Sequence, residues 1–410
     1  MKKKFLPIIL GSDENAYGIA RSFHEEYGVT SLALCTRELN AVKYSNILKV
    51  DIEVSLHDEK SFLNILIEKA KYYSTEYENL ILIPCSDYYT ELVVKNKDIL
   101  ENYYVSRFVD KKYFDMFITK DKFYSLCDKY KMNYPKTICC TLNMRKDIIK
   151  KINFPYPIVL KPNNSNSEEY LNCSIEDKKK AYIINTEEEL KIVLNKINKS
   201  TYKDNLIIQE FVPGDDTANR VLNCYSGIDG KVRSMCLGRP ILEEYFPSTI
   251  GNYAAIISLK EENKIFDSIK YFLEDIKYKG FSNFDLKYDR NSNEYKLFEI
   301  NPRQGRSSYS VTSCGINMAK LLVDDLIDHK EQKDIIKCKK EVLWLNLPFR
   351  LLDKYIENKE VLKEIKKLKK DNKVIHSLWY KEDLNLKRRL HLLRLYYIQT
   401  KLYRMYFIKK

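Results

Sequence analysis

Two acidic residues on opposite arms of a predicted hairpin carry the clearest chemistry in this 410-residue chain. Predicted strands at 281–288 and 294–300 flank a turn-rich segment, and a turn centred on Ser292 places Asp285 opposite Glu299. Two carboxylates that face each other across paired strands repel, which destabilises the sheet. A bound hard cation reverses that repulsion, so the pair predicts a magnesium site, with a solvated hairpin edge as the alternative.

An amide and an arginine extend this predicted site. Side chains alternate along a strand, so Asn301 shares a face with Glu299 and offers a third oxygen ligand. Arg303 lies two residues further on the same parity, where it can meet a phosphate that the metal also contacts. The segment therefore predicts a site for a metal-bound phosphate.

Two other strand ends suit a nucleotide. Lys161 closes an apolar strand and precedes Pro162, so its ammonium group projects from a rigid position and can compensate phosphate charge. The segment 209–216 closes another strand with polar groups around apolar ones, the combination that an adenine ring and a ribose hydroxyl require. An ordinary surface lysine is the alternative for Lys161.

At these residues the chain resembles the ATP-grasp superfamily, and within it the carboxylate–amine ligases of the D-aspartate-ligase group. The segment 301–308 (NPRQGRSS) is similar to the N-P-R-x-x-R-S-S segment of the superfamily, and the segment 11–21 is similar to the opening of the D-aspartate-ligase group. The resemblance covers roughly residues 5–330, and the C-terminal tail more weakly.

The resemblance implies roles for individual residues. The phosphate-binding lysines are Lys120, with Lys122 as the alternative in register, and Lys161. The adenine and ribose positions are Gln209, Glu210, Val212 and Asp216. The ligands of Mg²⁺, with Mn²⁺ as an alternative ion, are Asp285, Glu299 and Asn301, and Arg303 steadies the transferred phosphoryl group.

One feature departs from the family pattern. The loop after the second lysine is usually rich in glycine and folds over the triphosphate, but residues 163–173 contain no glycine. The substrate residues are predicted by position alone. Asn15, Arg306 and Ser307 flank the predicted phosphoryl site, so they are our candidates for binding the amino acid's carboxylates.

The reaction implied is ATP-dependent ligation, in which an acyl phosphate forms from a carboxylate and an amine then attacks its carbonyl. Within the family, D-aspartate as donor and the lysine amine of a UDP-linked peptidoglycan precursor as acceptor are expected. The alternatives are a ligase for another amino acid that makes a dipeptide or secondary metabolite, and a non-catalytic ATP-binding regulatory module. None of the five histidines lies beside a candidate nucleophile, which argues against a triad hydrolase.

The elements that must position these residues have an α/β and α+β pattern. Buried-type strands at 5–10, 31–35 and 80–84 alternate with helical stretches, which indicates a parallel sheet. The expected organisation is an ATP-grasp fold with three parts. An N-terminal Rossmann-like domain covers 1–110, an ATP-grasp domain of two subdomains with ATP between them covers 111–330, and a basic helical extension covers 331–410.

Charge is concentrated in that extension. Residues 331–410 contain 22 Lys and Arg against 10 Asp and Glu, so they carry nearly all of the net charge of +13. Such a tail suits an anionic acceptor or the anionic inner membrane face, and the alternative is a solubilising or dimerising helical tail. No nucleic-acid-binding module is recognisable, so no nucleic acid is expected as a partner.

The cellular location follows from what the sequence lacks. No stretch approaches the roughly 18 apolar residues that a membrane span needs. The ten cysteines form no C-x-x-C pair, as expected for buried thiols in a reducing compartment. We therefore expect a cytoplasmic protein, with peripheral membrane contact through the tail as the further option.

Overall fold

The computed structural model describes residues 2–145, 147–165, 167–246, 249, 251–260 and 264–407. The predicted loop at 163–173 and a predicted helix at 260–276 each include positions outside these ranges. The chain forms two compact units. Unit 1 comprises Met1–Phe114, Asp215–Phe284 and Asn301–Lys410, and unit 2 comprises Asp115–Gly214 and Asp285–Ile300. These units do not test the three-part division expected from the sequence, which stays a prediction.

The N-terminal part of unit 1 is a four-stranded parallel sheet in the order β3-β2-β1-β4. Six consecutive residues of β1 are buried, because this central strand is covered on both faces. The three predicted strands are confirmed, whereas the edge strand β3 was not predicted. The bounds are β1 (Lys3–Leu10), β2 (Ser31–Cys35), β3 (Leu48–Ile52), β4 (Tyr77–Pro84), α1 (Glu14–Tyr27), α2 (Glu59–Tyr73), α3 (Asp87–Lys95) and α4 (Lys97–Leu100).

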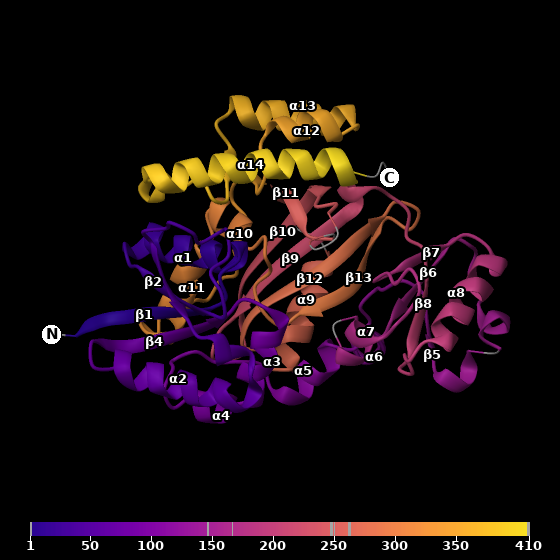
Figure 1. Ribbon diagram of the computed structural model, residues 1–410, viewed down its shortest axis with the longest axis horizontal. Helices are drawn as coiled ribbons and strands as arrows, with labels where there is room; N and C mark the ends of the chain where they lie inside the picture. The colour runs from indigo at the N-terminus through magenta and orange to yellow at the C-terminus, as the bar shows by residue number, and fades with distance from the viewer. Residues whose placement is uncertain are drawn as a thin grey trace. The chain divides into compact units, whose positions relative to one another are not determined.

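An eight-stranded sheet has the order β13-β12-β9-β10-β11-β15-β16, with β14 paired to β10. Its strands β9 to β13 are labelled in Figure 1. The predicted hairpin is confirmed as two neighbouring strands of this sheet. The strands are β9 (Asn219–Ser226), β10 (Val232–Glu243), β11 (Tyr253–Leu259), β12 (Gly280–Asp289), β13 (Glu294–Asn301), β14 (Ile336–Lys337), β15 (Leu343–Leu345) and β16 (Val374–His376). The helices between them are α9 (Lys264–Asp275), α10 (Tyr309–Ser313) and α11 (Met318–Leu326).

Unit 2 has its own antiparallel sheet in the order β5-β8-β6-β7. One face of this sheet and the helix α8 enclose a separate apolar core that includes Leu160, Leu190 and Ile208. The bounds are β5 (Thr137–Cys140), β6 (Ile158–Pro162), β7 (Tyr182–Ile184), β8 (Leu206–Glu210), α6 (Lys120–Lys129), α7 (Glu168–Asn172) and α8 (Glu187–Lys199), and α5 (Lys111–Phe117) precedes them. The α/β and α+β fold class expected from the sequence is therefore confirmed.

The C-terminal extension is more than helical. It contains the expected helices α12 (Arg350–Tyr355), α13 (Lys359–Lys370) and α14 (Leu386–Tyr406), but it also supplies β14, β15 and β16 to the eight-stranded sheet. The sequence prediction missed these three strands because each has only two or three residues, too few to show a period. Among the described residues, no helix is long and apolar enough to cross a membrane.

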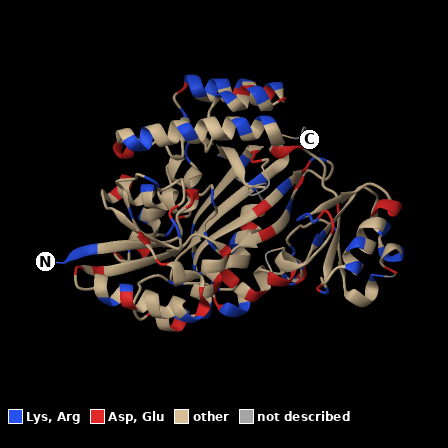
Figure 2. Cartoon of the chain, viewed as in Figure 1, with Lys and Arg blue, Asp and Glu red and all other residues tan. Residues whose placement is uncertain are grey.

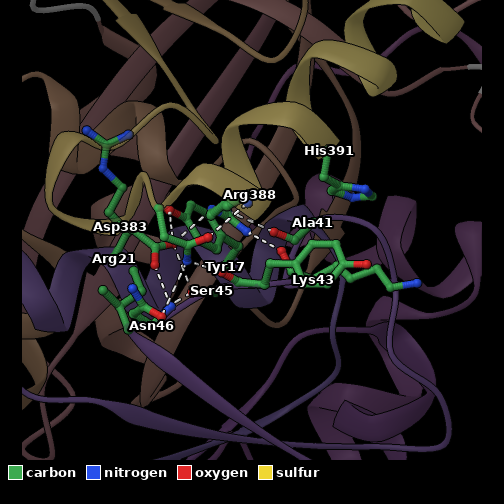
Figure 3. A network of polar contacts seen from close by, with 12 residues as sticks. Tyr17, Arg21, Ala41, Lys43, Ser45, Asn46, Asp383, Arg388 and His391 are labelled. Atoms are coloured by element: carbon green, nitrogen blue, oxygen red, sulfur yellow. Dashed lines mark hydrogen bonds and ion pairs between the residues drawn. The ribbon is translucent and has the colours of Figure 1, made fainter.

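A buried ion pair anchors α14 within unit 1. Arg388 Nε lies 2.9 Å from Asp383 Oδ2, and neither side chain is exposed to solvent. The guanidinium also donates to the carbonyl oxygens of Lys43 and Ala41. Tyr17 donates its hydroxyl to the same carboxylate at 2.8 Å, and Figure 3 shows these groups converging. The basic extension is thus an integral part of unit 1.

Candidate active site

Lys161 is held inside unit 2 by neutral groups. It stands near the end of β6 and is 8% exposed. Its Nζ donates to Gln209 Oε1 at 2.9 Å and to the Tyr124 hydroxyl at 3.4 Å, and it lies 5.3 Å from the centre of the Phe298 ring. Among the described residues, no carboxylate is hydrogen-bonded to this ammonium group, so it is ready to accept an external anion.

Burial and, to a smaller extent, the charge of Lys120 lower the pKa of Lys161 to about 7, and Glu299 opposes this shift. Lys120 begins α6, whereas Lys122 on the same helix is solvent-exposed. Lys120 contributes electrostatically to the lowered pKa of Lys161. This contribution favours Lys120 over Lys122 as the first phosphate lysine.

The polypeptide after β6 fixes the start of α6. Asn163 accepts from the Lys120 backbone N–H through its own carbonyl and from the Asp121 N–H through its side chain, at 3.2 and 3.0 Å. Ser167 then caps the short helix α7 by accepting from Tyr170 N–H at 3.2 Å. Side-chain and backbone hydrogen bonds therefore shape this glycine-free segment on either side of position 166, which lies outside the described residues.

The predicted adenine segment has its side chains engaged within unit 2. Gln209 is fully buried, accepts from Lys161 and donates from Nε2 to Thr137 Oγ1 at 2.7 Å. Glu210 pairs with Lys296, which also contacts Asp289 at 3.2 Å. Gln209 is thus a positioning residue for Lys161. The sequence analysis had assigned Gln209 to the adenine position and did not indicate this role.

The other two residues predicted to contact the adenine and the ribose, Val212 and Asp216, belong to different units. Val212 is buried in unit 2. Asp216 belongs to unit 1, is 6% exposed, and accepts from the Tyr245 hydroxyl at 2.9 Å and the Glu243 N–H at 3.1 Å through Oδ2. These bonds fix the orientation of the Asp216 carboxylate.

The hairpin acids are half-buried. Asp285 on β12 and Glu299 on β13 both belong to unit 2, and Glu299 acts electrostatically on Lys161. Asp285 is flanked by the buried Phe284 and Leu286, so its side chain emerges from an apolar part of the strand. The pairing of Asp285 with Glu299 across the hairpin stays a prediction.

The rest of the motif lies in unit 1, where Arg303 joins two loops. Arg303 Nε donates to Asp87 Oδ1 at 2.6 Å, and Nη2 lies 3.5 Å from Asn301 Oδ1. Asn301 in turn donates to Asn283 Oδ1 at 3.3 Å. Sequence reasoning did not select Asp87, although this first residue of α3, three positions after the end of β4, lies at the carboxyl edge of the parallel sheet, where ligands bind.

Arg306 is already neutralised by two carboxylates. Its Nε donates to Glu14 Oε2 at 3.0 Å and its Nη1 to Glu244 Oε2 at 2.7 Å. Burial raises the pKa of Glu244, and the adjacent Arg306 opposes that shift. Glu14 and Glu244 are site residues that the sequence did not reveal, because 230 positions separate them in the chain.

The loop before α1 is acidic and enclosed. Asp13 accepts from the backbone N–H groups of Asn15 and Ala16, so its own carboxylate occupies the anion-binding position at the start of α1. Burial, followed by repulsion from Glu14, raises the pKa of Asp13 to about 6.

Asn15 joins this loop to the motif. It donates from Nδ2 to the carbonyl oxygens of Cys85 and Gln304, at 3.0 and 3.1 Å. Its buried Oδ1 has no hydrogen-bond partner among the described residues. Ser307, which follows Arg306 in the sequence, is also buried and belongs to unit 1.

A cavity within unit 1 adjoins the motif. It is lined by Pro302, Arg303 and Gln304, by the end of β4 and by residues of β9 and β12. Its charged lining residues are Arg107, Lys279, Arg303 and Asp325, and most of the remaining wall is apolar. Three cationic groups against one carboxylate suit a small anionic ligand.

Comparison with known proteins supplies the wider context. The chain is 38% identical over 412 residues to D-aspartate ligase of Enterococcus faecium, covering 99% of this chain and 97% of the relative. No family model matches the chain.

Solved structures share the fold at low sequence identity. N5-carboxyaminoimidazole synthetase of Staphylococcus aureus aligns with a TM-score of 0.57 at 15% identity, covering 87% of this chain and 86% of that one. L-amino acid ligase of Bacillus licheniformis aligns with a TM-score of 0.54 at 14% identity, covering 80% and 74%.

Proposed function

Because the chain belongs to the D-aspartate ligase family, we propose that it uses ATP to join D-aspartate to the lysine side-chain amine of a peptidoglycan precursor. The observation that carries the donor assignment is the similarity to D-aspartate ligase over 99% of the chain. The fold and the buried Lys161 support the use of ATP.

The chemistry requires charge neutralisation more than covalent catalysis. A carboxylate oxygen of D-aspartate attacks the γ-phosphorus of ATP, and ADP leaves as the acyl phosphate forms. The amine nitrogen then attacks the acyl carbon, the bond to the phosphate oxygen breaks, and the nitrogen loses a proton. Lys120 and Lys161 are proposed to hold the phosphates, and Arg303 to steady the transferred group.

The predicted metal ligands suit a hard cation. Asp285 and Glu299 offer carboxylate oxygens and Asn301 an amide oxygen, the donor types that Mg²⁺ and Mn²⁺ prefer. The bound ion would shield the charge of the triphosphate. Glu210 and Val212 are proposed to border the adenine and Asp216 the ribose, while Gln209 keeps Lys161 in place.

The surroundings of Arg306 change the view of donor binding. Arg306 already has two carboxylate partners, which reduces its capacity to bind a third. The acids Asp13, Glu14 and Glu244 and the unpartnered Oδ1 of Asn15 suit an ammonium group instead. We propose that this cluster recognises the donor's α-amino group, with Ser307 beside it, while a carboxylate faces Arg303.

The exposed face of α14 is proposed to contact the membrane. Leu386, Leu390, Leu393 and Tyr397 recur at helical spacing and are 73, 60, 51 and 69% exposed. Lys and Arg residues alternate with this stripe in the sequence of α14, and Figure 2 colours several of them blue along the helix. An apolar stripe with basic neighbours suits an anionic lipid surface. The enzyme would then act at the cytoplasmic face, where a UDP-linked acceptor is anionic too.

Amino-acid-dependent ADP release tests the function. Purified full chain with Mg²⁺ and ATP is offered D-aspartate, L-aspartate, D-glutamate and D-alanine, each with and without the UDP-linked pentapeptide precursor. We expect the largest ADP release with D-aspartate plus precursor, and a product one aspartyl residue heavier by mass spectrometry. Release with D-aspartate alone and a free dipeptide product would favour dipeptide synthesis. No response to any amino acid would overturn the ligase assignment in favour of a regulatory module.

A further inference from the structure

Three cysteines converge in unit 1 away from the residues assigned above. The Sγ atoms of Cys236, Cys314 and Cys338 all lie within 4.8 Å of one another, and Cys236 and Cys314 are 3.5 Å apart. The three side chains are 3, 0 and 9% exposed. They come from three different elements, so the tertiary structure alone brings them together.

Strand pairing explains part of this arrangement. β14 runs parallel to β10, with Ser234 opposite Ile336 and Met235 opposite Lys337. Continuing that register by one residue places Cys338 beside Cys236 on the same face of the sheet. Cys314 ends the short helix α10 and contributes the third sulfur.

The sulfur triangle has the size of a metal site. Around an ion with metal–sulfur distances of about 2.3 Å, three sulfurs in a plane lie about 4 Å apart, and tetrahedral geometry brings them slightly closer. The separations in this cluster, from 3.5 Å to at most 4.8 Å, span that value. Small movements of the side chains would therefore place all three sulfurs at bonding distance from one ion.

We infer that Cys236, Cys314 and Cys338 form a thiolate site for one thiophilic d¹⁰ cation, Cu⁺ or Zn²⁺. Sulfur ligands without a carboxylate among them select soft ions over Mg²⁺. Three thiolates suffice for Cu⁺, whereas Zn²⁺ in a protein requires a fourth ligand. Each bond forms from a thiolate, so the thiols release their protons as the ion binds. Lys260 acts electrostatically on Cys338 and would offset part of the resulting negative charge.

The metal site would stabilise the position of the polypeptide that follows the NPRQGRSS segment (residues 301–308). Cys314 lies six residues after Ser308, the last residue of the NPRQGRSS segment, and α10 connects the two. An ion shared by β10, α10 and the polypeptide after β14 would hold this helix against the sheet. The three sulfurs are close together only in the folded chain, so the ion should bind the folded state more tightly than the unfolded state. It should therefore raise the midpoint of thermal unfolding.

Metal titration of the reduced full chain tests the inference. Under anaerobic conditions, Cu⁺ or Zn²⁺ is added in competition with a chromophoric chelator, and the ion is expected to bind at one equivalent per chain and to raise the midpoint of thermal unfolding. Comparison of the two ions distinguishes them: tighter binding of Cu⁺ than of Zn²⁺, each relative to its chelator, indicates a three-coordinate site.

Single serine variants of each cluster cysteine identify the ligands. Cys236→Ser, Cys314→Ser and Cys338→Ser should each weaken binding by at least roughly 100-fold, since a lost ligand costs more than a lost neighbour of a ligand. Cys224→Ser is the matched control, because Cys224 is buried on β9 opposite Met235 and so faces the other side of the sheet. If Cys314→Ser fails to fold, Cys338→Ser still tests the site at its most exposed member. Absence of binding in the wild type, or equal loss in Cys224→Ser, would overturn the inference.

Discussion

Lys161 Nζ and Gln209 Oε1 are joined by a buried 2.9 Å hydrogen bond, and the other end of the same amide donates to Thr137 Oγ1. In the described part of the chain, the buried lysine therefore has neutral hydrogen-bond acceptors and no carboxylate partner. A neutral partner orients the ammonium group but leaves its charge available for an anion. This relationship is what the proposed nucleotide site depends on.

Replacing Gln209 with leucine should weaken nucleotide binding. The change removes the acceptor that orients Lys161, and loss of a hydrogen bond to a charged group costs about 1.5–3 kcal/mol. We expect ADP affinity, measured by isothermal titration calorimetry, to fall by at least 10-fold. Thr137→Val removes only the second bond of the amide and should have a smaller effect. Equal affinity in Gln209→Leu and wild type would contradict the positioning role.

The pKa of Lys161 predicts a pH dependence of stability. It lies near 7 in the folded protein and at the ordinary lysine value of 10.5 in the unfolded chain, so the unfolded chain binds more protons between these values. This lysine therefore makes the folded state more stable as pH rises through that window. Lys161→Met should remove this contribution. The substitution should therefore raise the free energy of unfolding of the nucleotide-free protein more at pH 7 than at pH 10, and the two increases should differ by an amount on the order of 1–3 kcal/mol.

Urea unfolding of the two proteins at both pH values measures this difference. Lys122→Met is the control, since Lys122 lies on the exposed face of α6 and should not change the pH profile. A Lys161→Met profile parallel to that of the wild type would show that the ammonium group is not destabilised by burial.

Glu299→Gln should abolish turnover without unfolding the protein. Glutamine keeps the size of the side chain but removes the charge that a divalent cation requires. We expect ADP release to fall by at least 100-fold, with a thermal midpoint close to that of the wild type. Glu294→Gln, an exposed substitution at the start of the same strand, is the control. Retained turnover in Glu299→Gln would refute the metal assignment.

The buried pair of Asp383 and Arg388 should be essential for stability. Removing one partner leaves an uncompensated charge inside unit 1, a loss of about 3–5 kcal/mol. Arg388→Met and Asp383→Asn are each expected to lower the free energy of unfolding by that amount, and the double variant to lose less than their sum. Arg389→Met, one residue further on the exposed face, should change stability by less than about 0.5 kcal/mol.

Vesicle co-sedimentation tests the exposed face of α14. The full chain should bind vesicles that contain anionic lipid and should dissociate as salt is added, because screening weakens the attraction of Lys and Arg to the headgroups. Leu390→Asp with Tyr397→Asp should abolish binding and leave ADP release in solution unchanged. Ile192→Asp on α8 is the control, since Ile192 is an exposed apolar helix residue far from α14 in the sequence. Binding by the α14 variant equal to that of the wild type would sink the membrane proposal.

The sequence by itself determined the elements that repeat a local pattern. The strands β1, β2 and β4 are apolar runs of ordinary length, and the β12–β13 hairpin surrounds a cluster of turn residues, so short-range preferences were sufficient. The motif from Asn301 to Ser308 indicated the family because its residue types are consecutive.

Tertiary structure decided what each functional side chain contacts. Arg306 was assigned to the substrate from its position, yet its partners Glu14 and Glu244 lie 292 and 62 residues away. Gln209 faces Lys161 across two paired strands, and three cysteines meet from β10, α10 and the end of β14. Such contacts depend on sheet register and on the path of the chain between elements. No local period encodes them, so the carboxylate partners of Arg306 and the convergence of the thiols emerge only when the chain is folded.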